Sequence, residues 1–350
     1  MAVTKESFGR IADGREASLY TLSVSPTLEV KVTDYGATLV AVLVQDKNEH
    51  MTDVVLGYDD AAGYEQGHGH FGAIVGRSGN RIDHAQFELN GKVYHLKANT
   101  FEHNLHSGDD YFGKRLWTEE EVTEDSVTFS LFDADMQQGY PGNFTCHVTY
   151  KVQDEGRLSI HYLATSDQDT VANMTNHVYF NLDGHDQGNV HDQELMIRAE
   201  AYTPVSDHTA IPTGELAPVE GTPMDFRTPH TIGARIDADF EQMKMLGGYD
   251  HNYVIKKDKG AIEKIAEAYS PKTGICLTAY TDLPGVQFYA GNSIGEGTPG
   301  KGGAVYNPRS GFCLETQYFP NSINQEGFAS PVLKAGDTYD TTTIYKFWVR

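Results

Sequence analysis

Three short runs of the chain alternate apolar side chains with groups that can bind polar ligands or move protons. They are residues 176–182 (NHVYFNL), 286–290 (VQFYA) and 312–318 (FCLETQY). Successive side chains of a strand point to opposite faces, so each run presents one apolar face and one polar face. The polar faces carry amides and tyrosines together with one histidine, His177, and one glutamate, Glu315. A histidine and a glutamate on one surface can act as general acid and general base.

The composition of these polar faces separates two interpretations. For any one strand, a solvated sheet face is the simpler interpretation, but such faces usually carry Lys, Thr, Glu and Ser. Amides and carboxylates instead suit the many hydroxyls of a sugar, and aromatic rings suit its apolar C–H face. The three runs together favour a carbohydrate site.

Two other motif matches and two pairs of histidines do not indicate a cofactor. Residues 295–301 have the spacing of a phosphate-binding loop, but Gly302 stands where that loop requires Ser or Thr. Residues 291–295 match the nucleophile elbow, but no helix is expected to follow them. Histidines at positions 68, 70, 103 and 106 lack the HExxH spacing and a supporting carboxylate pattern. We therefore expect no metal ion and no other cofactor.

The elements that must hold the polar groups are predicted to be strands. Glycine (35 residues) and tyrosine (20 residues) are abundant, as in chains of many short strands joined by tight turns. Residues 87–96 alternate about Asn90 and Gly91, which predicts a hairpin on a type I′ turn. Residues 148–162 predict a second hairpin, with its turn at residues 154–156. The pattern lacks repeated strand-helix alternation, which argues against a doubly wound parallel sheet.

Few helices are expected. Residues 61–66 and 238–243 have room for one or two helical turns each, and residues 260–269 are compatible with either a helix or a strand. The chain has no low-complexity linker, no clean break in composition and no obvious internal repeat. The sequence thus predicts an all-β protein in which residues 1–350 form a single domain.

Charge and cysteine content limit the partners and the compartment. Lys and Arg number 27 against 49 Asp and Glu, which gives a net charge of −22. Such an acidic surface repels phosphate backbones and anionic lipids, so neither nucleic acid nor a membrane is an expected partner. The chain starts without the apolar core of a signal peptide, and its three cysteines form no CxxC pair. We expect a cytoplasmic monomer or homodimer whose partner is a small molecule.

Nine stretches together carry a resemblance to a known family. They are residues 76–82, 104–106, 139–142, 175–182, 211–215, 221–226, 250–252, 284–287 and 314–317. Each stretch is weak evidence alone, but all of them in this order make a specific match over nearly the whole chain. The sequence is similar to those of the aldose 1-epimerases (galactose mutarotases).

The resemblance implies a fold and an acid-base pair. The implied fold is a large antiparallel β-sandwich of the galactose-mutarotase type with few short helices, which holds the sugar in an open cleft on one large sheet. By position, Glu315 matches the general base of the family and His177 matches its general acid.

The resemblance also implies residues that bind the sugar. His106 matches a second active-site histidine that holds or polarises the sugar. Arg81, Asp250 and Gln287 match ligands of sugar hydroxyls, and Asn80 matches an assisting residue.

The implied reaction interconverts the α and β anomers of free aldohexoses such as galactose and glucose. Ring opening requires that the anomeric hydroxyl lose a proton while the ring oxygen gains one. A glutamate with its ordinary pKa of about 4.3 is already ionised at neutral pH, and a histidine with a pKa of about 6.5 is partly protonated. This chemistry requires no metal, nucleotide or covalent intermediate.

Two departures from the family pattern and three alternatives accompany this interpretation. Ser107 stands where the family commonly has Gly, and Asn321 stands where Asp often follows the Phe-Pro pair. Both departures bear on loop shape and sugar preference and leave the catalytic positions unchanged. The alternatives are a non-catalytic carbohydrate-binding protein, a mutarotase that prefers another sugar such as maltose, and a glycosidic hydrolase that uses Asp250 and Glu315 as its two carboxylates.

Overall fold

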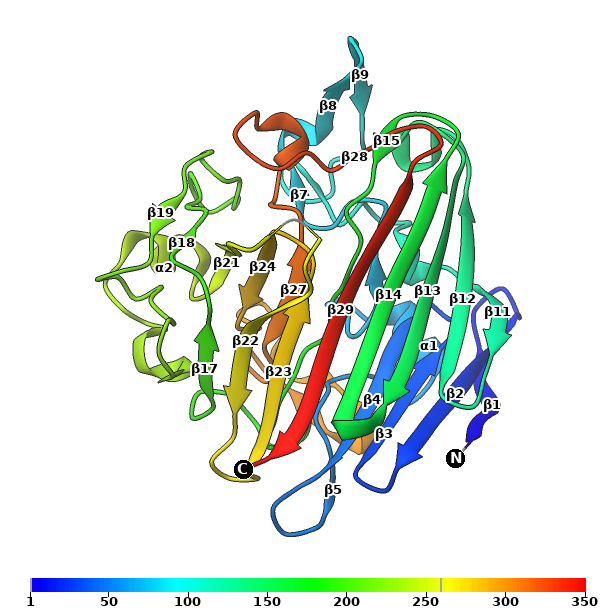
Figure 1. Ribbon diagram of the computed structural model, residues 1–350, viewed down its shortest axis with the longest axis vertical. Helices are drawn as coiled ribbons and strands as arrows, with labels where there is room; N and C mark the ends of the chain where they lie inside the picture. Colours follow the sequence, from blue (N-terminus) through cyan, green and yellow to red (C-terminus); the bar gives the residue numbers. More distant parts are fainter. Residues whose placement is uncertain (1, 259) are drawn as a thin grey trace.

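The chain folds into antiparallel sheets, as seen in a computed structural model that describes residues 2–258 and 260–350 (Figure 1). The largest sheet has nine strands, and Figure 1 shows four of them, β12, β13, β14 and β29, side by side along the molecule. In spatial order its strands are β11 (Thr118–Val122), β12 (Ser126–Asp133), β13 (Phe144–Gln153), β14 (Arg157–Ser166), β29 (Thr338–Val349), β23 (Ile275–Thr281), β22 (Glu263–Tyr269), β17 (Glu194–Ile197) and β20 (His230–Thr231).

Two five-stranded sheets accompany the large one. The first contains β1 (Ala2–Arg10), β2 (Glu16–Ser25), β3 (Leu28–Thr33), β4 (Thr38–Gln45) and β5 (Met51–Asp53). The second, which we call the site sheet, contains in spatial order β19 (Ala217–Pro218), β18 (Ala201–Tyr202), β21 (Asp250–Val254), β24 (Gly285–Tyr289) and β27 (Cys313–Gln317).

Short ladders and helical turns complete the described part of the chain. The two-stranded ladders are β6 (Ile74–Val75) with β16 (Thr175–Asn176), β7 (Arg81–Ile82) with β10 (Asn104–Leu105), β8 (Gln86–Leu89) with β9 (Lys92–His95), β15 (Thr170–Val171) with β28 (Val332–Leu333), and β25 (Thr298–Pro299) with β26 (Val305–Tyr306). The α-helices are α1 (Ala61–Gln66) and α2 (Glu241–Leu246), and the 3-10 turns cover Asp83–Ala85, Phe112–Lys114, Gln137–Gly139, Asp154–Gly156, Ile232–Arg235, Lys301–Gly303 and Ser322–Asn324. No helix within the described ranges has both the length and the apolar content of a membrane span.

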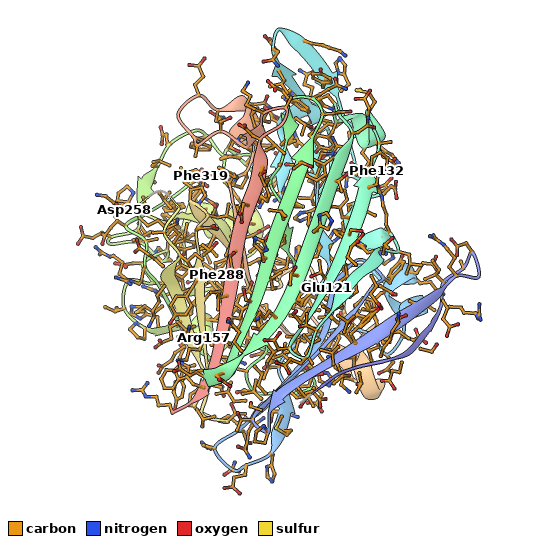
Figure 2. All side chains as sticks on the ribbon, turned by 45° about the vertical axis from the view of Figure 1, so that its right-hand side comes forward. Glu121, Phe132, Arg157, Asp258, Phe288 and Phe319 are labelled. Atoms are coloured by element: carbon orange, nitrogen blue, oxygen red, sulfur yellow. The ribbon has the colours of Figure 1, made fainter. Side chains whose placement is uncertain are left out.

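The apolar faces of the layers meet in one large core cluster. In β13 every second side chain from Phe144 to Val152 is buried, as the alternating sequence predicts. The site sheet contributes Phe288 from β24, which is labelled in Figure 2 among the side chains behind the large sheet and is fully buried. Burial of each such side chain contributes about 1.5–3 kcal/mol to folding. The predicted all-β sandwich is confirmed.

Two tyrosines of the nine-stranded sheet reach across this core toward the site sheet. The Asn176 side-chain amide donates a hydrogen bond to the Tyr162 hydroxyl (2.8 Å). The Tyr345 hydroxyl lies 3.0 Å from Asn176 Oδ1 and 2.9 Å from the carbonyl oxygen of Leu314. Asn176 and Leu314 each directly precede one member of the predicted acid-base pair, so the large sheet holds the Asn176 side chain and the Leu314 backbone next to these positions.

The predicted turns are confirmed, and the ambiguous segment is resolved. Asn90 and Gly91 both have positive φ values (54° and 75°), as a type I′ turn requires. The second hairpin turns at residues 154–156, between paired Gln153 and Arg157. Residues 263–269 form strand β22, paired on both sides, so sheet pairing overrides the helical propensity of that segment.

Two predicted elements differ in their bounds or regularity. Helix α1 is confirmed at residues 61–66, but α2 begins at Glu241, three residues later than predicted, and ends at Leu246, where Gly247 follows in the left-handed conformation (φ 66°). The run 176–182 is not one continuous strand. Beyond Asn176 it makes only isolated bridges, in which Phe180 pairs with both Val55 and Phe312.

A buried ion pair anchors the segment that leads to the predicted sugar ligands at residues 80 and 81. Arg77 is fully buried and donates to the Asp133 carboxylate from Nε (2.9 Å) and Nη2 (2.6 Å). It also donates to the carbonyl oxygen of Pro141 (2.8 Å). Asp133 accepts a further hydrogen bond from Arg115 Nη1 (2.6 Å), so every charge in this group has a partner.

Replacing Arg77 by Met is expected to lower the free energy of unfolding by about 3–5 kcal/mol, because Asp133 would remain as a buried charge without its main partner. Urea denaturation measures this loss. Arg157→Met is the matched control, because Arg157, labelled in Figure 2, is exposed and its pairing with Glu155 (3.3 Å) is worth at most about 1 kcal/mol. Equal losses in the two variants would contradict the anchoring role.

Candidate active site

Three neighbouring strands of the site sheet place the predicted polar residues on one face. Gln287 of β24 is in direct register with Glu315 of β27 and with Asn252 of β21. Asp250 lies two residues from Asn252 and therefore on the same face of β21. The polar residues of the runs 286–290 and 312–318 therefore lie on the same face of the site sheet. They are not solvated, however, since Gln287 and Glu315 are only 3% and 2% exposed.

His177 reaches the same place from the segment that follows β16. Its backbone N–H donates to the carbonyl oxygen of Ala73 (2.9 Å), and its own carbonyl accepts from the N–H of Gly72 (2.9 Å). The imidazole Nε2 lies 3.6 Å from Glu315 Oε1, and Nδ1 lies 3.6 Å from Cys313 Sγ. The predicted acid and base are therefore adjacent, on elements far apart in sequence.

Asn80, Arg81 and His106 come from the paired segments around β7 and β10. The N–H of Asn80 donates to His106 Nδ1 (3.1 Å), and the N–H of His106 donates to the carbonyl oxygen of Asn80 (3.0 Å). Both residues have left-handed backbones (φ 57° and 53°), which aims their side chains inward from a tight turn. Because Nδ1 of His106 accepts a hydrogen bond, Nε2 is the nitrogen left to meet a ligand.

A closed circuit of polar contacts connects the sugar-ligand candidates. Arg81 Nη2 lies 3.8 Å from Asp250 Oδ2, and Gln287 Nε2 donates to Asp250 Oδ1 (2.7 Å). Gln317 Nε2 donates to Gln287 Oε1 (3.2 Å), and its Oε1 accepts from Asn80 Nδ2 (3.3 Å). Asn80 Oδ1 accepts from the backbone N–H of Arg81 (3.0 Å), which completes the circuit. Each side chain is thereby held in one orientation.

A cavity of about 200 Å³ lies over this circuit. Six of the seven predicted site residues line it, namely Asn80, Arg81, His106, His177, Asp250 and Glu315. Gln287 does not line the cavity and instead holds Asp250, one layer behind the ligand position that the resemblance implied.

Sequence reasoning missed a third histidine at the cavity and left two of its tyrosines without a role. His70 lines the cavity, although its glycine-rich surroundings gave no periodic signal. Tyr179 and Tyr289 also line it, and both lie on the polar faces of the runs described above. Tyr179 stacks on His177 with ring centroids 5.0 Å apart.

The electrostatics of the pair differ from the expectation of ordinary pKa values. Burial, reinforced by the charge of Asp250, raises the pKa of Glu315 well above 4.5, and Arg81 opposes that rise. Burial and the neighbouring His70 lower the pKa of His177 well below 6.5. Both shifts run against the expectation of an ionised glutamate beside a partly protonated histidine in the free protein, because both charged forms lose hydration.

The two shifts together define how many protons the pair holds. The lowered pKa of His177 disfavours a state in which both groups are protonated. The raised pKa of Glu315 disfavours a state in which neither is protonated. Between these limits the pair holds one proton, and the direction of both shifts favours Glu315 over His177 as its position in the free protein.

The same side chains can also serve as metal ligands. His106, His177 and Glu315 each place one ligand atom within 4.8 Å of the others. Two histidines and a glutamate are a donor set found in catalytic zinc sites. The expectation of no metal therefore stays a prediction.

The two departures from the family pattern have local structural roles. Ser107 has a left-handed backbone (φ 67°), and its Oγ accepts from the Ser78 N–H (2.8 Å) and donates to the Ser78 carbonyl (2.9 Å). Asn321 Oδ1 accepts from the N–H of Asp83 (3.0 Å), and the N–H of Asn321 donates to the Arg81 carbonyl (2.7 Å). Both residues therefore brace the loops that carry His106 and Arg81.

Known proteins are similar to this chain in sequence and in fold over nearly its whole length. A family model described as Aldose 1-epimerase matches residues 18–346. The galactose mutarotase of Homo sapiens is 42% identical over 350 residues, 99% of each chain, and the aldose 1-epimerase of Escherichia coli (strain K12) is 35% identical over 96% of each chain. The crystal structure of galactose 1-epimerase from Lactobacillus acidophilus NCFM is similar with a TM-score of 0.86, at 26% identity over 100% of this chain and 99% of that one.

The full-length match, the sandwich fold and the paired Glu315 and His177 lead to one conclusion. The chain belongs to the aldose 1-epimerase family.

Proposed function

We propose that this protein is an aldose 1-epimerase that interconverts the α and β anomers of free aldohexoses such as galactose and glucose. The observation that carries the proposal is the buried pair of Glu315 and His177, 3.6 Å apart on the wall of the cavity that the predicted site residues line. A pair that holds one proton can remove a proton at one oxygen and deliver one at another, which is the requirement of ring opening.

In the proposed mechanism Glu315 is the base and His177 is the acid. Glu315 takes the proton of the anomeric hydroxyl as His177 gives a proton to the ring oxygen, and the bond between C1 and the ring oxygen breaks to leave an aldehyde. After rotation about the bond to C1, both transfers reverse and the ring closes as the other anomer. This reactive form differs from the resting form by transfer of one proton within the pair, and Arg81 favours it by lowering the pKa of Glu315.

The remaining cavity residues bind and orient the sugar in this proposal. His106, whose pKa is lowered well below 6.5 by burial and by His70 and His177, stays neutral and offers Nε2 to a sugar oxygen. Arg81, Asp250 and Asn80 bind hydroxyls, and Gln287 fixes Asp250. Acid and base together lower the barrier by about 5–11 kcal/mol, if each contributes roughly 10²–10⁴-fold.

The proposal extends to the setting of the enzyme. We place it in the cytoplasm as a monomer or homodimer, and its three cysteines, all free and buried, suit a reducing compartment. We treat residues 1–350 as one domain, because a single core cluster draws residues from Tyr20 through Phe347.

Polarimetry of freshly dissolved α-galactose tests the activity. An epimerase speeds the approach to an unchanged final rotation. A carbohydrate-binding protein leaves the time course unaltered, and a hydrolase given a disaccharide releases reducing sugar and changes the final value. The initial rates with galactose, glucose and maltose rank the sugars and test the preference for free hexoses.

Glu315→Gln is expected to reduce turnover at least about 10²-fold, because the amide keeps the shape of the side chain but takes no proton. His177→Asn should cause a comparable loss. Polarimetric rates at saturating galactose measure both. Glu155→Gln, at an exposed carboxylate in a turn of the large sheet, is the matched control and should leave turnover unchanged. A Glu315→Gln enzyme with normal turnover would remove Glu315 from the mechanism.

The pH range in which Glu315 and His177 together hold one proton should follow their shifted pKa values. On acidification the one-proton form is lost only when His177 is protonated as well. Burial lowers the pKa of His177 below 6.5, so this loss occurs at a lower pH than for an exposed histidine. On alkalinisation the one-proton form is lost when Glu315 gives up its proton. Burial raises the pKa of Glu315 above 4.5, so this loss occurs at a higher pH than for an exposed glutamate. Nitrogen-15 NMR of histidine-labelled protein should therefore show a neutral His177 ring at about pH 6, where an exposed histidine is mostly protonated. A His177 ring that titrates near 6.5 would contradict this assignment.

Gln287→Leu is expected to raise KM for galactose by roughly 5- to 50-fold with a smaller change in kcat. The substitution keeps the volume of the side chain but removes a hydrogen bond to the charged Asp250, a bond worth about 1.5–3 kcal/mol. Steady-state kinetics separates the two constants. If kcat fell while KM stayed constant, Gln287 would act on the chemical step and not through Asp250.

A further inference from the structure

His70 completes a triangle of imidazoles at the wall of the sugar cavity. Its ring centroid lies 5.0 Å from that of His106 and 5.4 Å from that of His177, which are themselves 5.2 Å apart. On its other side the ring meets Tyr111 edge-on at 4.7 Å. His70 lines the cavity beside the predicted sugar ligands, but the acid-base mechanism does not use it.

The backbone holds His70 in this position at a conformational cost. Its φ of 60° is left-handed, a region that is unfavourable for a residue with a Cβ. The following turn is closed by a hydrogen bond from the Ala73 N–H to the His70 carbonyl (3.1 Å) and is joined to the backbone of His177. The preceding turn is fixed by Lys114, whose Nζ donates to three carbonyl oxygens, including that of Gly67 (3.0 Å). Strained residues held by their surroundings in this way are concentrated at functional sites.

The two nitrogens of the His70 ring have different environments. Nδ1 is closed off from solvent and has no hydrogen-bond partner among the described residues, whereas Nε2 is not closed off. In its neutral form the ring carries one N–H. A buried N–H without a partner is costly, which favours the tautomer with its proton on Nε2.

We propose that His70 is a further sugar-binding residue, whose Nε2–H donates a hydrogen bond to a hydroxyl oxygen of the hexose other than the anomeric one. The inference rests on the proposed function, since it concerns the same cavity. The anomeric oxygen is assigned to the acid-base pair, so the third imidazole is left for a hydroxyl elsewhere on the ring. His70 thereby contributes to discrimination among hexoses that differ at that hydroxyl.

The test is a double-mutant cycle between the side chain and the sugar. His70→Phe keeps the aromatic packing against Tyr111 and removes the donor, and His70→Asn suits the left-handed backbone but is too short to reach the sugar. Each variant is compared with the wild type on galactose and on the four monodeoxygalactoses that each lack one hydroxyl other than the anomeric one. Both kcat/KM by polarimetry and Kd by calorimetry are measured, and thermal unfolding confirms that the variants are folded.

His68→Phe is the matched control. His68 lies two residues earlier on the same glycine-rich segment, is exposed, and lines a neighbouring cavity of about 570 Å³ instead of the sugar cavity. The His68→Phe variant should bind and convert all five sugars as the wild type does.

We expect both His70 variants to weaken galactose binding and to lower kcat/KM by roughly 2- to 13-fold, the range of a single neutral hydrogen bond. With one of the deoxy sugars, and only one, this loss should disappear, because the partner of His70 is already missing. An equal loss with all sugars would reduce His70 to a packing role and overturn the assignment, as would no loss with galactose.

The two readouts separate this inference from the proposed function. If the wild type binds galactose without speeding mutarotation, the proposed function fails, and the cycle in Kd still decides the role of His70. If the wild type binds none of the sugars, both are overturned.

Discussion

The structure depends on the burial of one glutamate and one histidine side by side in a largely apolar sandwich. Glu315 and His177 are 2% and 4% exposed, and water therefore stabilises neither charged form. That loss of hydration raises the pKa of Glu315 and lowers that of His177, and it leaves one proton for the two groups. In bulk water the same pair would hold its proton in the opposite order, on the imidazole. The fold thus sets the protonation state of its reactive groups by exclusion of solvent more than by any single charge.

Around that pair, the sandwich has to keep a dense set of polar groups in fixed orientations. The circuit from Arg81 through Asp250, Gln287 and Gln317 to Asn80 does this with side chains that each have a partner on both sides. Glu315 Oε2 and Arg81 Nε are nevertheless buried without partners among the described residues. Buried polar atoms normally have partners, so the described side chains do not satisfy one another completely at this site.

Much of this arrangement could be predicted from the sequence, and the parts that could not have physical reasons. Alternation of apolar and polar residues gives the faces of β24 and β27, because a strand has a period of two whatever its neighbours are. The hairpin at Asn90 and Gly91 is equally local, since the turn needs two positive φ values. Strand β22 could not be separated from a helix, because its pairing with β17 involves residues distant in sequence. His70 lines the cavity, whereas Gln287 lies behind Asp250. Both positions depend on the depth of a side chain in the folded protein, which the pattern of residues along the chain does not contain.

The contacts of Tyr162 and Tyr345 with Asn176 and Leu314 have a consequence for how this enzyme family can vary. Through these contacts, a change in the distance of the large sheet from Asn176 and Leu314 would also change the distance between the two reactive side chains that follow them. Laboratory evolution for altered rates would then be expected to select changes on the buried side of the large sheet, far from any atom of the sugar. Replacements on the outer side of that sheet would leave this separation unchanged.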